Sequence, residues 1–158
     1  MILVSACLLG INCKYNGKNN RNPFVLELGK KVQLVPVCPE QLGGLSTPRV
    51  GAEISGGAGK QVLEKKARVV NQQGEEVTSY FLKGAAETLR LAEIMGSNMA
   101  ILKSHSPSCG SGFIYSGEFD GKLKEGDGVT AALLKEKGLL VLNENIFSDN
   151  QKGKEESI

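Results

Sequence analysis

The sequence predicts an α/β fold: a single compact, Rossmann-like domain with a mainly parallel sheet and helices on both faces. Short apolar runs rich in branched residues recur along the chain and are typical of buried strands: residues 1–6, 31–37, 67–71, 99–103 and 139–142. Segments with helical patterns lie between most of these runs, and such alternation is typical of parallel sheets. The length of 158 residues suits one domain with its own core, which we place at residues 1–147.

Three helices are expected, over residues 23–29, 78–95 and 128–137. Apolar residues in the second of them fall near a 3.6-residue period, so one face should be buried. A glycine ends each helix, and a side chain that can cap it stands before each: Asn22, Thr78 or Ser79, and Asp127. Residues 41–60 are rich in glycine and are expected to form a long loop. Residues 148–158 are polar and are expected to form a disordered tail.

Composition and charge narrow the classes of function. The formal net charge of +2 gives no electrostatic case for binding a long nucleic acid. The apolar N-terminal run is too short to span a membrane, and no basic segment precedes it, so a cytoplasmic protein is predicted. No glycine-rich phosphate loop follows the first strand, which counts against a plain nucleotide-binding domain. Nothing in the pattern fixes the oligomeric state.

Three of the four cysteines stand at the ends of predicted strands. Cys7 follows the run 1–6, Cys38 follows the run 31–37, and Cys109 comes shortly after the run 99–103. The carboxyl ends of parallel strands meet at one edge of a sheet, where ligands bind in this class of fold. We therefore expect the three thiols to lie in one crevice.

Convergent thiolates in a chain with one histidine favour a soft metal centre. A four-iron cluster held by three cysteines leaves one iron open to act as a Lewis acid. The fourth cysteine, Cys13, either completes the ligand set or is a bystander. A zinc site with four cysteine ligands, a non-catalytic module that binds metal or sulfur, and cysteines that are merely buried all remain open at this point.

Four sequence blocks, in this order, resemble a known family: Ser5–Gly10 with Cys13–Gly17; Val37–Leu45 with Thr47–Arg49 and Ala52–Ile54; Leu102–Lys103 with Ser106–Gly110; and Gly128–Leu134. The chain is similar to the bacterial family catalogued as domain of unknown function 523, which includes 2-thiouracil desulfidase. The resemblance extends to about residue 145. It implies a compact α/β fold and an oxygen-sensitive [4Fe-4S] cluster held by Cys7, Cys38 and Cys109. It also implies that sulfur in a thiolated pyrimidine, or a nucleotide that carries one, is replaced by oxygen with release of sulfide.

Four further residues within these blocks are candidates for the site. Glu40 follows Cys38 closely and is the predicted group that activates water or moves a proton. Ser106, predicted to be catalytic, and Ser108, predicted to bind substrate, can hydrogen-bond the ring or the cluster sulfides; turn capping is their structural alternative. Arg49 is a predicted substrate-binding cation, and Glu53 is expected to pair with it and hold the loop.

Overall fold

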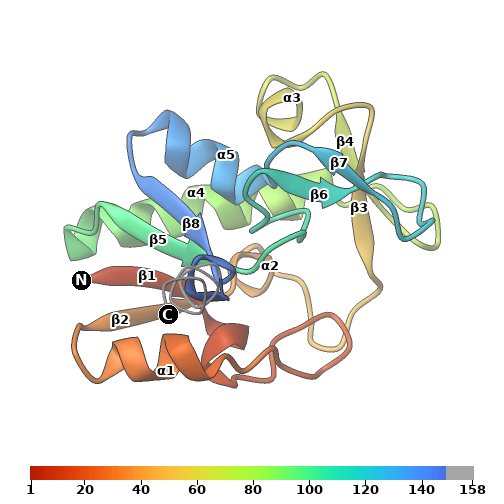
Figure 1. The fold of residues 1–158 in the computed structure, drawn as a ribbon. Helices are drawn as coiled ribbons and strands as arrows, with labels where there is room; N and C mark the ends of the chain where they lie inside the picture. The colour runs from red at the N-terminus through yellow and green to blue at the C-terminus, as the bar shows by residue number, and fades with distance from the viewer. Residues whose placement is uncertain (149–158) are drawn as a thin grey trace, which may run out of the picture.

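The computed structural model describes residues 1–148, and its centre is a four-stranded parallel sheet (Figure 1). Its strands are β1 (Ile2–Ser5), β2 (Leu34–Val37), β5 (Met99–Leu102) and β8 (Leu140–Asn143), in the order β2-β1-β5-β8. All three strand pairings are parallel. The predicted α/β fold with a parallel sheet is confirmed.

Helices cover both faces of this sheet, α1 on one and α4 with α5 on the other (Figure 1). They are α1 (Pro23–Gly29), α4 (Thr78–Met95) and α5 (Val129–Glu136). Successive strand residues point to opposite faces. Leu3, Ala100 and Leu102 accordingly share a core cluster with side chains of α4 and α5, whereas Val4 and Ile101 pack in a cluster with Val25 of α1.

The three expected helices form, but only one has the predicted cap. Asn22 Oδ1 accepts the N–H groups of Phe24 and Val25, at 3.0 and 3.1 Å. Thr78 does not cap α4, because its hydroxyl accepts the N–H of Val69 in a neighbouring strand. Asp127 does not cap α5, because its carboxylate accepts the N–H of Gly112 and pairs with Lys135. In both cases a tertiary hydrogen bond replaces the local one.

Regular elements were missed in three segments. The expected loop at 41–60 contains the second half of α2 (Pro39–Leu42), all of β3 (Ala52–Ser55) and the start of α3 (Gly59–Leu63), and β3 pairs antiparallel with β4 (Arg68–Asn71). The run at 67–71 is therefore a strand, but it lies outside the main sheet. A second hairpin joins β6 (Phe113–Tyr115) to β7 (Leu123–Glu125). A single turn of 3₁₀-helix, η1 (Ala6–Leu9), follows β1.

A pair of glycines brings α2 against α4. A Cβ atom on Gly84 would overlap the carbonyl oxygen of Pro39, and one on Gly43 would overlap the carbonyl oxygen of Tyr80. Only hydrogen fits at these two positions, so the backbones of the two helices approach closely. The segment that begins at Cys38 is thereby fixed on the longest helix of the described chain.

Within residues 1–148, no helix is long and apolar enough to cross a membrane. The division into a domain at 1–147 and a tail at 148–158 stays a prediction, because residues 149–158 lie outside the described part of the chain.

Candidate metal centre

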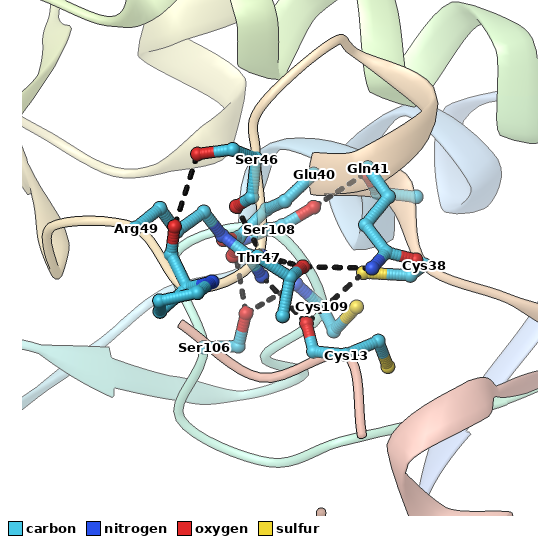
Figure 2. A network of polar contacts seen from close by, with 12 residues as sticks. Cys13, Cys38, Glu40, Gln41, Ser46, Thr47, Arg49, Ser106, Ser108 and Cys109 are labelled. Carbon is cyan, nitrogen blue, oxygen red and sulfur yellow. Dashed lines mark hydrogen bonds and ion pairs between the residues drawn. The ribbon is translucent and has the colours of Figure 1, made fainter. Parts of the chain in front are cut away.

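All four cysteines line one cavity, of about 570 Å³, at the carboxyl edge of the sheet, and Figure 2 shows three of them, Cys13, Cys38 and Cys109. Cys7 lies in η1 directly after β1, and Cys38 directly follows β2 as the residue before α2. Cys109 follows β5 through the loop 103–108. These strands are neighbours in the sheet, with β1 between β2 and β5. The structure thus brings the three strand-end cysteines together, and it adds Cys13 to them.

Cys13 lies beside two other cysteines of the cavity. The Cys38 thiol donates to the carbonyl oxygen of Cys13 over 3.7 Å, and side-chain contacts with Cys38 and Cys7 raise the pKa of the Cys13 thiol. The same contacts lower the pKa of Cys7 and lower that of Cys38 to about 6. The N–H of Gln41 and the positive charge of Arg49 also lower the pKa of Cys38. Because metals bind thiolates, the lowered pKa values prepare two sulfurs for metal binding.

Cys109 lies in a loop that is fixed from two sides. Burial raises the pKa of its thiol, opposed by a hydrogen bond from Ser5. Ser106 Oγ accepts the N–H groups of Ser108 and Cys109, at 3.1 and 3.0 Å. The first N–H groups of α5 also donate to carbonyl oxygens of this loop. The helix terminus therefore holds the cysteine loop and has no free donors for an anion.

The two predicted serines differ in their access to the cavity. Ser106 lines it, and its hydroxyl retains a proton to donate after accepting the two backbone N–H groups. Ser108 is 1% exposed, and its hydroxyl is hydrogen-bonded to that of Thr130 at 2.9 Å. Its predicted contact with a substrate is not favoured by this placement.

Glu40 and Arg49 form an ion pair at the cavity wall (Figure 2). Arg49 Nε donates to Glu40 Oε2 over 2.6 Å. The Nη atoms of Arg49 donate to the carbonyl oxygens of Ser46 and Cys13 and to Thr47 Oγ1. The guanidinium is thus engaged by the protein itself, so its predicted contact with a substrate is not favoured either. Within residues 1–148, Glu40 Oε1 accepts no hydrogen bond.

Comparison with known proteins agrees with this arrangement of the site. Residues 2–145 match the sequence model of the family described as 2-thiouracil desulfurase. The chain belongs to this family. It is 51% identical over 149 residues to the uncharacterized protein YbbK of Bacillus subtilis (strain 168), a match that covers 94% of this chain and 99% of YbbK.

A solved structure in the 2-thiouracil desulfurase family has the same fold. It is that of the [4Fe-4S]-dependent thiouracil desulfidase TudS (DUF523Vcz), which is 39% identical to this chain. The TM-score is 0.82, and the match covers 94% of this chain and 93% of TudS. The predicted family and the predicted fold are both confirmed.

The donor set of this family member fits an iron–sulfur cluster better than a single ion. Sulfur ligands suit iron–sulfur clusters and zinc alike. Among the described residues, however, no three histidine, cysteine or acidic side chains gather in a way that could hold one metal ion. The four thiols instead surround a cavity. A cavity lined by thiols gives room for a multi-iron cluster.

Sequence reasoning missed a second ion pair at the same cavity of the desulfurase fold. Lys103, which lines the cavity, donates from Nζ to Glu144 Oε1 over 2.6 Å, and Glu144 also accepts the N–H of Ser104. Burial alone would raise the pKa of Glu144, but the hydrogen bond and the charge of Lys103 outweigh it and lower that pKa. The two residues stand 41 positions apart, and no local pattern links them.

Proposed function

We propose that this protein is a [4Fe-4S]-dependent thiouracil desulfidase, which replaces the sulfur of a thiolated pyrimidine by oxygen and releases sulfide. The observation that carries the proposal is the single cavity lined by four cysteines and the carboxylate of Glu40. Membership of the 2-thiouracil desulfurase family and the likeness to TudS support it. The four free cysteines suit a reducing compartment, so we expect the protein to work in the cytoplasm.

Cys7, Cys38 and Cys109 would hold the cluster, one from the end of each of three neighbouring strands. When bound, the cluster would supply a soft Lewis-acidic iron that takes up the thiocarbonyl sulfur and weakens the carbon–sulfur bond. The lowered pKa values of Cys7 and Cys38 favour their thiolate forms.

The remaining chemistry is assigned to side chains of this chain. Glu40 Oε1, which accepts no hydrogen bond within residues 1–148, takes a proton from water at the ring carbon. The new carbon–oxygen bond forms, the carbon–sulfur bond breaks, and the two protons of the water end on sulfide. No oxidant or reductant is needed. Ser106 donates a hydrogen bond to the ring and keeps its proton, and Arg49 holds Glu40 in place.

The test is the conversion of 2-thiouracil by the anaerobically reconstituted protein. We expect uracil and sulfide in equal amounts, without an added oxidant or reductant. Glu40→Gln should keep the cluster and lose turnover by about 10²-fold or more, as is typical for a lost general base. Glu27→Gln, a change at an exposed carboxylate of α1, is the matched control and should behave like the wild type. A cluster-loaded wild type that forms no uracil would overturn the function, and full activity of Glu40→Gln would remove Glu40 from the mechanism.

A further inference from the structure

The loop between β6 and β7 carries an aromatic side chain to the cavity. Phe119 lines the cavity together with Gly121 of the same loop, and 37% of Phe119 is exposed. Its φ of 53° lies in the left-handed region, which a bulky residue rarely adopts. Such a conformation persists only where the surroundings impose it, and it is concentrated at functional sites.

A buried carboxylate from another hairpin imposes this conformation. Glu53 of β3 is 8% exposed, and its Oε2 accepts the N–H groups of Gly117 and Phe119, at 2.8 and 3.0 Å. The expected pair of Glu53 with Arg49 does not form, since Arg49 is bound to Glu40. Glu53 therefore binds the backbone of the loop 116–122, which lies more than sixty residues further along the chain.

Two more contacts dock the same loop on β3. Gly117 lies so close to the carbonyl oxygen of Ile54 that a Cβ atom there would overlap it, and its φ is 97°. Lys124 Nζ donates to the same carbonyl oxygen over 3.0 Å. Inside the loop, Ser116 donates its hydroxyl to Asp120 and its N–H to the carbonyl oxygen of Lys122. The loop is therefore preorganised, and the backbone of Phe119 is held at the cavity.

We propose that Phe119 is a specificity-determining residue that stacks on the pyrimidine ring of the substrate, and that Glu53 is the positioning residue that holds it there. This inference rests on the proposed function for the identity of the ring. A flat, uncharged ring matches an exposed aromatic face, and stacking between a base and an aromatic side chain contributes measurably to binding. Glu53 also lines the cavity, and its Oε2 binds the loop backbone at Gly117 and Phe119, through which it positions the Phe119 side chain.

The first test is the binding of 2-thiouracil and uracil by calorimetry to the anaerobic, cluster-loaded protein, with KM and kcat measured beside it. Phe119→Ala should raise Kd and KM about tenfold, with little change in kcat and unchanged iron content. Phe119→Tyr keeps an aromatic face and should retain tight binding. Phe113→Ala is the matched control, since Phe113 is an exposed aromatic of the same hairpin outside the cavity lining, and it should change nothing. Unchanged binding by Phe119→Ala would overturn the stacking role.

The second test addresses Glu53. Amide hydrogen exchange of the segment 113–125 should be slow in the wild type and much faster in Glu53→Ala, with Glu53→Gln in between. Glu53→Ala should raise KM as much as Phe119→Ala does, and the double variant should be no worse than either single one, because both remove the same contact. Additive losses would show that Glu53 acts by another route.

The outcomes also separate this inference from the proposed function. If Phe119→Ala weakens the binding of 2-thiouracil but the wild type never turns 2-thiouracil over, the desulfidase function is overturned and the stacking role stands. If the wild type desulfurises 2-thiouracil and Phe119→Ala leaves binding unchanged, the desulfidase function stands and the stacking role is overturned. A wild type that binds neither pyrimidine would overturn both.

Discussion

Arg49 Nε donates to Glu40 Oε2 over 2.6 Å, and Nη2 of the same guanidinium donates to the carbonyl oxygen of Cys13 over 2.9 Å. One side chain therefore ties the carboxylate that follows β2 to the loop that follows η1. The side chains of Arg49 and Glu40 are only 7% and 16% exposed, so water does little to screen the pair. Removing either partner leaves the other charge nearly buried without compensation.

Arg49→Ala should lower the free energy of unfolding by about 3 kcal/mol, because it breaks a largely buried ion pair and leaves the Glu40 carboxylate without an opposite charge. Turnover should fall as well, since Glu40 loses its fixed position, whereas the iron content should stay close to that of the wild type. Chemical unfolding and iron analysis check both effects. Lys30→Ala, which breaks an exposed ion pair with Glu27, is the control and should change stability by less than about 0.5 kcal/mol. A loss as small as that of the control would mean that the Arg49 pair is not structurally important.

The four cysteines should respond unequally to replacement by serine. Cys7→Ser, Cys38→Ser and Cys109→Ser should each abolish cluster binding, because each removes one of the proposed ligands. Cys13→Ser should be milder, since a serine hydroxyl still reaches toward Cys7 and Cys38 as a hydrogen-bond donor. Iron and acid-labile sulfide content after anaerobic reconstitution is the measurement. Equal loss in all four variants would indicate a site with four cysteine ligands.

Gly84→Ala should destabilise the protein, although alanine is ordinarily better than glycine inside a helix by about 1 kcal/mol. Here the new Cβ atom would overlap the carbonyl oxygen of Pro39, so α2 must shift and take Glu40 with it. We expect a loss of about 1–3 kcal/mol in unfolding free energy, typical of overpacking. Lys83→Ala, an exposed neighbour on α4, should be nearly neutral. A stabilised Gly84→Ala variant would contradict the close approach of the two helices.

Stability should depend on pH through Glu144. Lys103 and the N–H of Ser104 lower the pKa of Glu144 in the folded state, so the unfolded chain binds this proton more readily. The stabilisation is present above the ordinary carboxylate pKa of about 4.3 and is lost as pH falls below it toward the folded value. Unfolding free energy measured from pH 7 to pH 3 should fall less steeply in Glu144→Gln than in the wild type. Equal slopes would show that Glu144 does not contribute.

The sheet and the position of its cysteines could be predicted because both depend on patterns that are visible within a few consecutive residues of the sequence. Buried strands are continuous apolar runs, and parallel topology then places Cys7, Cys38 and Cys109 at one edge. The elements inside 39–63 could not be found in this way. Helices α2 and α3 span four and five residues, which is too short for a helical period to appear. Their glycines, typical of loops, serve instead for close approach of backbones.

Most contacts of the candidate site depend on tertiary partners that no local pattern reveals. Glu53 was expected to pair with Arg49 nearby in sequence, yet it binds the backbone of Gly117 and Phe119. Lys103 pairs with Glu144, which lies far along the chain and which no local pattern links to it. In each case the partner comes from an element whose position the sequence did not define.

We propose that the strand-end cysteines of this chain hold a [4Fe-4S] cluster. The most direct test is the iron and acid-labile sulfide content of the anaerobically reconstituted protein, measured beside its visible absorption spectrum. We expect about four irons and four sulfides per chain with a broad brown absorption band. A preparation with no iron, or with one zinc per chain, would contradict it, and the proposed desulfidase function would be lost with the cluster.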